Sequence, residues 1–134
     1  MGGLRMAAIA SLTPLEELDD DPFLVDTRGQ RAMCARWAEE RGHTITRHLI
    51  VHGLRHDHRG LWADVEEGRV DGFVTPNTRV LARALASVDR FTAECARRGV
   101  PIETADLAEP VYDAAMKADV HRRLSMPTAG YDGC

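Results

Sequence analysis

The stretch GRVDGFVTPNTRVLARAL, residues 68–85, joins a strand pattern to a helix pattern and so indicates the fold class. Its first half carries Phe73 and Val74 and is typical of a buried strand, whereas its second half has apolar residues at helical spacing. An Asn-Thr turn separates the halves, and Arg79 and Arg83 follow it. Ligands of open α/β sheets bind beyond the carboxyl ends of strands, so these two arginines are candidate phosphate-binding residues.

Strand and helix patterns alternate on both sides of this stretch. The expected strands are residues 6–12, 43–51, 69–74 and 100–107, and the expected helices are residues 27–41, 61–67, 80–98 and 110–124. Four strand-helix pairs in strict alternation predict an α/β three-layer domain with right-handed crossovers. We therefore expect a mostly parallel sheet of four or five strands, covered by helices on both faces.

The length of 134 residues suits one domain with one core, which we expect to span residues 1–125. The last nine residues, MPTAGYDGC at 126–134, are predicted to form a polar tail. The acidic run LEELDDD, residues 15–21, lacks the glycine and distal glutamate of a calcium loop and predicts a solvated loop or a frayed turn.

The composition excludes several classes of function. A net charge of -4 offers no overall attraction to nucleic acid or an anionic membrane, although residues 28–59 carry seven arginines against three acids. The first residues are too short and polar to span a bilayer. Three cysteines without CxxC spacing suit a reducing cytoplasm, and Cys34, on an apolar helix face, is expected to be a buried, inert thiol.

The histidines suggest a metal site only weakly. His48 and His52 are four residues apart, and on a strand such positions lie more than ~12 Å apart. His56 and His58 form at most a weak, adventitious site. Neither GxxxxGK[ST] nor GxGxxG occurs, and we expect no cofactor.

Four stretches carry a recognisable order of motifs: QRAMCARWAEERGHTI (30–45), HRGLWADVEEGRVDGFV (58–74), VLARALASVDRF (80–91) and RRGVPIETADL (97–107). In this order they resemble the catalytic domain of serine recombinases, the resolvase and invertase family, over residues 5–107. The resemblance implies a resolvase-like α/β fold, assembly into dimers or larger homo-oligomers, and DNA recombination chemistry. Arg59 and Arg83 keep family positions.

The sequence differs from the family at the positions that carry the catalytic chemistry. Its strand ending Tyr-x-Arg-x-Ser supplies the serine that attacks DNA, and here Ser11 stands at the arginine position and Thr13 at the serine position. The family's acid after the second strand falls on Val51, and its later Asp-Arg pair falls on Arg79 and Val80. Threonine is a stiff, β-branched substitute for the nucleophile.

Two functions follow as alternatives. The first is a non-catalytic pseudoenzyme that associates with itself or another protein, through the helix expected at 80–98 or the apolar residues of the last helix. The second is a residual DNA strand-transfer or nicking enzyme that uses Ser11 or Thr13, with Arg59, Arg79 and Arg83 on the phosphate. Such a set could bind DNA only weakly, because few phosphates would be neutralised.

Overall fold

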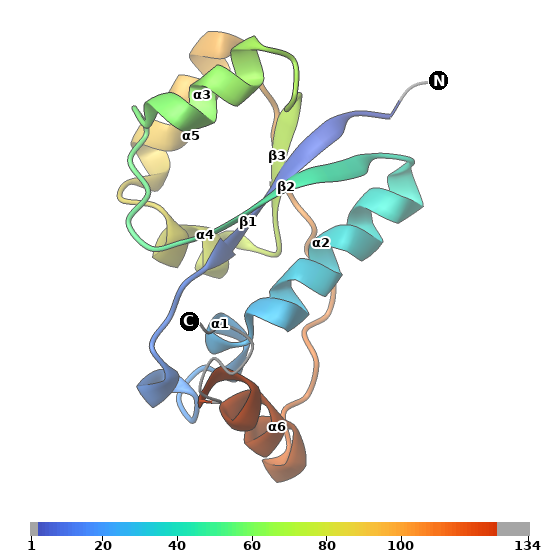
Figure 1. The fold of residues 1–134 in the computed structure, drawn as a ribbon, viewed down its shortest axis with the longest axis vertical. Helices are drawn as coiled ribbons and strands as arrows, with labels where there is room; N and C mark the ends of the chain where they lie inside the picture. The colour runs from blue at the N-terminus through green and yellow to red at the C-terminus, as the bar shows by residue number, and fades with distance from the viewer. Residues whose placement is uncertain (1–2, 126–134) are drawn as a thin grey trace, which may run out of the picture.

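The computed structural model describes residues 3–125 and contains one four-stranded parallel sheet. The strands are β1 (Arg5–Ser11), β2 (Thr44–Val51), β3 (Gly72–Thr75) and β4 (Ile102–Thr104), in the spatial order β2-β1-β3-β4 (Figure 1). Helices cover both faces, and the predicted α/β fold class is confirmed. The expected polar tail at 126–134, with Cys134, lies outside the described residues.

One face of the sheet is covered by α2 (Thr27–Arg41), whose bounds agree with the sequence prediction. The buried Trp37 and Met33 of this helix pack with Met6 and Ala8 from alternate positions of β1. Gly42 ends the helix in the left-handed region, at φ 74°, where glycine has no side chain to clash.

The opposite face carries α3 (Arg59–Glu66) and α5 (Val88–Arg98) (Figure 1). Their core contains three aromatic rings. Phe73 of β3 meets Trp62 edge-on at 5.7 Å between ring centroids and Phe91 at 5.3 Å. Such edge-to-face pairs fix ring orientation as well as burying apolar area, so α3 and α5 are held against the same strand.

The prediction of a single helix at 80–98 is wrong, because the chain forms two helices there, α4 (Thr78–Ala84) and α5. Leu85 is extended and pairs with Leu54, whose N–H donates to the Ala84 carbonyl and whose carbonyl accepts from the Ala86 N–H. Ser87 then caps α5 through its hydroxyl. A distant backbone partner therefore overrides the helical periodicity.

Two strands are shorter than predicted. Residues 69 and 70 were assigned to the third strand, but their N–H groups donate to the Asp64 carbonyl and close the end of α3. The fourth strand was expected at 100–107, yet only Ile102–Thr104 pairs with β3.

The acidic run forms a short turn, and three of its five acidic side chains are exposed, but the run is more ordered than a solvated loop. It contains the short 3-10 helix η1 (Leu15–Glu17) and leads into α1 (Pro22–Val25). Leu18 within the run is buried, and α1 buries its last three residues. The segment folds back over the carboxyl end of β1, below the sheet in Figure 1.

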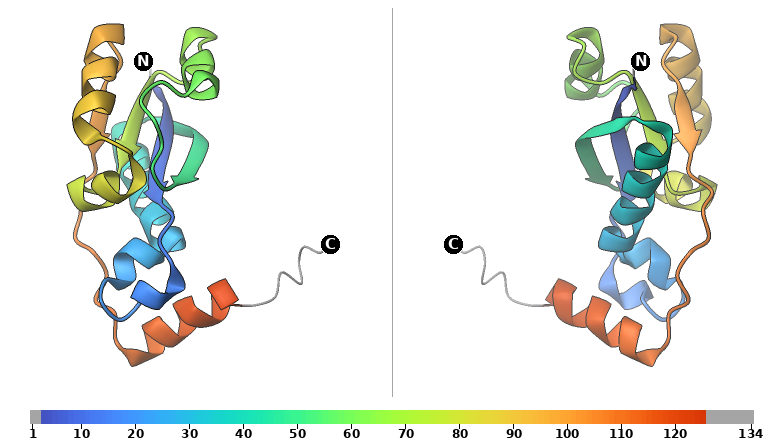
Figure 2. Two further views of the ribbon diagram at one scale, coloured as in Figure 1. Left: turned by 90° about the vertical axis from the view of Figure 1, so that its left-hand side faces the viewer. Right: turned by 90° about the vertical axis from the view of Figure 1, so that its right-hand side faces the viewer.

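The last helix, α6 (Ala114–Ser125), begins four residues later than the predicted first turn at Pro110. Its buried Val120 packs against Leu18 and Val25, so α6 covers η1 and α1 at the base of the molecule (Figure 2). None of the helices within residues 3–125 is long and apolar enough to cross a membrane.

Candidate functional site

The candidate site lies where β1 and β3 end, at the carboxyl edge of the sheet, the usual ligand position in this architecture. Four of the five residues expected to form a phosphate site lie around this edge. Ser11 ends β1, Thr13 follows it, and Arg79 and Arg83 project from α4. The segment containing η1 and α1 covers the same edge.

Ser11 is fully buried and its hydroxyl is used internally. The hydroxyl donates to the Leu24 carbonyl at 2.9 Å and accepts from the Gln30 amide at 3.0 Å. The Ser11 N–H donates to the other end of the same amide, Gln30 Oε1, at 2.7 Å. These contacts bind β1 to α1 and α2, so Ser11 acts as a structural residue here.

Gln30 is the residue that sequence reasoning missed. It is fully buried on α2, and its Nε2 group also lies 2.8 Å from the Phe23 carbonyl and 2.9 Å from the Leu24 carbonyl. A signal was present, because Gln30 lies one turn before Cys34 on the predicted apolar face. A polar side chain there must find partners inside the protein.

Thr13 is buried, with its hydroxyl 3.4 Å from the Ser11 hydroxyl. Within residues 3–125, no arginine or lysine hydrogen-bonds to either hydroxyl. A nucleophile for phosphoryl transfer needs an open line of attack and cations on the phosphate oxygens. The pair of hydroxyls therefore lacks both requirements in this conformation.

Arg83 forms a two-pronged ion pair with Glu17 of η1, with nitrogen to oxygen distances of 3.0 and 2.6 Å. The hydrogen bonds lower the pKa of Glu17 and raise that of Arg83, because each charge stabilises the other. Parallel N–H···O contacts are the geometry with which guanidinium groups also grip phosphate. Here the chain's own carboxylate holds that position.

Arg79, the other arginine expected on the phosphate, is also paired with carboxylates. It donates to both oxygens of Asp21, at 2.8 and 3.2 Å, and to Glu109 at 3.0 Å. Asn77 holds Glu109 in place with a 2.9 Å hydrogen bond. The acidic run and Glu109 thus neutralise both arginines of the candidate site.

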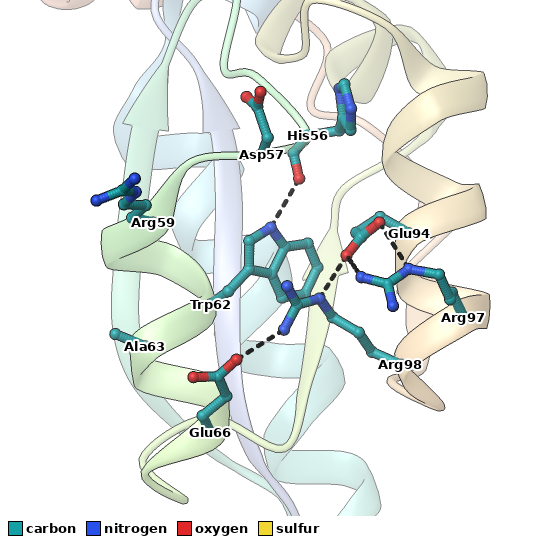
Figure 3. A pocket seen from close by; sticks show the side chains of 9 residues that line it. All are labelled: His56, Asp57, Arg59, Trp62, Ala63, Glu66, Glu94, Arg97 and Arg98. Atoms are coloured by element: carbon teal, nitrogen blue, oxygen red, sulfur yellow. Dashed lines mark hydrogen bonds and ion pairs between the residues drawn. The ribbon is translucent and has the colours of Figure 1, made fainter.

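Arg59, the fifth candidate, lies elsewhere. It begins α3 and lines an open depression of about 540 Å³ between α3 and α5. Figure 3 shows Arg98 lying over Trp62, with its guanidinium carbon 4.4 Å from the ring centroid, and bonded to Glu94 and Glu66. No hydrogen bond or ion pair in the described part of the chain joins Arg59 to the other four candidates.

The weak metal candidates have structural contacts. His58 caps α3 by accepting from the Leu61 N–H at 3.3 Å, and the His56 carbonyl accepts from the Trp62 indole at 2.7 Å. His48 lies in a strand, as predicted, and burial lowers its pKa. Residues 3–125 contain no group of three or more His, Cys, Asp or Glu placed to hold a metal ion.

Cys34 is buried as expected, and burial raises the pKa of its thiol to about 12. Cys95 is also buried, with its pKa raised to about 11. A thiol is nucleophilic only as thiolate, so both groups are poor nucleophiles near neutral pH.

Removing the Glu17 charge is expected to lower the melting temperature at neutral pH but not at acidic pH. Because the folded-state pKa of Glu17 is lowered, its ion pair stabilises the fold fully above the ordinary glutamate range, and this stabilisation is lost as pH falls through the lowered pKa. The melting temperature of Glu17→Gln should lie below that of the wild type at pH 7, and the difference should shrink below about pH 4. The exposed neighbour variant Glu16→Gln is the control, and an equal effect from it would contradict the assignment.

Comparison with known proteins gives no relative: no family model, no curated protein and no solved structure matches this chain.

Proposed function

We propose that this chain is a non-catalytic, resolvase-like module that works by associating with a second copy of itself or with another protein. The proposal combines the resemblance of four sequence stretches to serine recombinases with the contacts at the carboxyl edge of the sheet. We also place the protein in the cytoplasm, because the buried free thiols of Cys34 and Cys95 suit a reducing compartment.

One observation carries the non-catalytic assignment: the groups needed on a phosphate are already engaged within the chain. The hydroxyl of Ser11 is buried and hydrogen-bonded, Arg83 is paired with Glu17, and Arg79 is paired with Asp21 and Glu109. A phosphodiester would have to displace Glu17 to reach Arg83, and Asp21 and Glu109 to reach Arg79. Its own negative charge would then lie beside those carboxylates, which opposes binding.

The energetics of phosphoryl transfer also support a non-catalytic function. Catalysis of phosphoryl transfer depends on positioned cations that neutralise charge developing on the oxygens, and each tenfold in rate corresponds to about 1.4 kcal/mol. Cations already neutralised by carboxylates contribute little of this stabilisation. The family's Asp position is also filled by Val51, which can neither accept a proton nor orient a cation.

Association is supported by apolar side chains left exposed near α6. Val111 is 87% exposed, Leu124 43% and Met116 37%. The exposed apolar surface of the last helix is smaller than the sequence indicated, because Val120 is buried and the Tyr112 hydroxyl donates to Asp26. Exposed apolar residues of this kind are common at protein contacts but do not by themselves identify a partner.

Incubation of the protein with supercoiled DNA is expected to yield no nicked circles and no covalent adduct. Agarose and denaturing protein gels would measure both. The matched variant Thr13→Ser restores the family's nucleophile and should also be inactive, because Arg79 and Arg83 stay paired with carboxylates. Any DNA binding should be weak and should vanish by about 0.2 M salt.

An adduct on Ser11 or Thr13 that disappears when that residue is replaced by alanine would overturn this proposal. It would establish the alternative function, residual DNA strand transfer or nicking of the serine recombinase type. Nicking by Thr13→Ser alone would show that the remaining parts of the site still assemble, and would equally contradict the argument from the paired arginines.

A further inference from the structure

The outer strand β2 is unusually exposed for a parallel sheet. None of its eight residues is buried, and five of them are exposed. Strands of parallel sheets are ordinarily covered on both faces, whereas β2 lies at one end of the strand order. In both views of Figure 2, β2 forms the outer side of the sheet next to β1.

The hydrogen bonds at the end of β2 define which backbone groups face outward. The Val51 carbonyl accepts from the Leu12 N–H at 2.8 Å, so the peptide groups of Val51 point toward β1. The direction alternates along a strand, and Leu49 and Arg47 therefore also point toward β1. The N–H and C=O groups of His48 and Ile50 point away from the sheet, toward solvent.

A bulge limits the regular part of this edge. Met6 is paired with Ile45 and Ala7 with Arg47, which leaves Thr46 as an extra residue on β2. Bulges bend a strand and interrupt further pairing, and natural proteins use them to protect exposed edges. The five residues from 47 to 51 follow the bulge and form an uninterrupted edge with no proline or lysine.

We propose that two copies of the chain pair through this edge, with their β2 strands antiparallel about a two-fold axis at Leu49. In this register, His48 of each copy lies opposite Ile50 of the other. Both residues face outward, so each of the two pairs exchanges two main-chain hydrogen bonds, which makes four in all. The result is a continuous eight-stranded sheet with an isologous interface.

The side chains fit this register. Leu49, partly buried against its own core, meets Leu49 of the second copy, and Arg47 lies opposite Val51 rather than opposite another arginine. Like charges directly across a strand pair would be unfavourable. Ile50, whose backbone faces outward at this edge, is 37% exposed. A register centred on His48 would instead place the bulge residue Thr46 opposite Ile50 of the second copy, inside the paired segment.

This inference rests on the proposed self-association and names the surface that performs it, β2 rather than α6. A second copy is the favoured occupant because in this register Leu49 meets Leu49 and each Arg47 meets Val51, so apolar groups pair and no like charges lie opposite each other. The pairing would also satisfy backbone groups that otherwise depend on water.

The decisive variant is Ile50→Pro. Proline removes an N–H that faces outward, so the hydrogen bonds between β2 and β1 remain, while its ring blocks the approaching strand. Sedimentation equilibrium should show a wild-type dimer and a dissociation constant raised at least ~100-fold in the variant, which is the expected loss when two central hydrogen bonds and the close strand approach are removed. Circular dichroism would check that the variant is folded. Ile50→Lys provides an independent test of the same edge if the proline variant is unfolded.

Amide hydrogen exchange gives a second readout on the wild type. The His48 and Ile50 amides should exchange quickly in dilute protein and slow at least ~10-fold as the dimer forms, whereas the Leu49 amide should be protected at both concentrations. Exchange at His48 and Ile50 that does not change upon dimerisation would overturn the β2 assignment.

The control variant is Met116→Glu on α6, which should leave the dimer intact. If it dissociates the dimer while Ile50→Pro and Ile50→Lys do not, the β2 interface is refuted and self-association stands through α6. A wild-type protein that stays monomeric at high micromolar concentration would refute this interface and the self-associating form of the proposed function together.

Discussion

Replacement of Gln30 with alanine is expected to lower the free energy of unfolding by about 3–5 kcal/mol, because several buried polar groups lose their partner at once. The Ser11 N–H loses its acceptor, and the carbonyls of Phe23 and Leu24 lose the amide donor. The loss should be large for a single polar side chain, since Gln30 connects β1, α1 and α2 in a fully buried position.

Urea denaturation followed by circular dichroism would measure this effect, with Arg31→Ala as the control on the same helix, since Arg31 is exposed. Arg31→Ala should change the free energy of unfolding by less than about 0.5 kcal/mol. The double variant with Ser11→Ala should lose less than the sum of the single variants, because the two side chains share one hydrogen-bond network. Additive losses would contradict the assignment of Ser11 as part of that network.

Replacement of Phe73 with alanine is expected to cost about 3–5 kcal/mol of stability, the range for removing a large buried ring. Phe73 is fully buried in β3 and contacts both Trp62 and Phe91 edge-on. Its removal leaves a cavity between the sheet and both α3 and α5, and each remaining ring loses an aromatic partner.

The same denaturation experiment, followed by near-UV circular dichroism of the aromatic residues, would report the loss of packing. Val111→Ala is the matched control, because Val111 is 87% exposed and its truncation should change stability by less than about 0.5 kcal/mol. A loss below 1 kcal/mol for Phe73→Ala would mean that the core collapses around the missing ring, against the close packing described here.

The pairing of arginines with carboxylates changes how the recombinase resemblance is understood. The resemblance brings Arg83 to a family position, but the nearest charges to it are those of Glu17. The acidic run at residues 15–21 supplies two of the three carboxylates. The same segment therefore covers the carboxyl edge of the sheet and pairs with its arginines.

The amino-acid sequence alone determined the type and order of most elements. The bounds of α2 were predicted correctly because helical periodicity and the stop at Gly42 are local signals. The parallel sheet followed from the alternation of strand and helix patterns. Each helix carries the chain back to the end of the sheet where the next parallel strand begins.

Only the tertiary structure decided where the helical pattern around Leu85 breaks and which charges meet at the site. The helix breaks at Leu85 because the backbone of Leu54, 31 residues earlier, hydrogen-bonds to the residues on either side of it, Ala84 and Ala86. Arg79 and Arg83 find their carboxylates on a segment 58 and 66 residues away along the chain. Local propensity favours an element, but the partner of a charge or an unpaired peptide group is set by which distant segments the folded core brings alongside it.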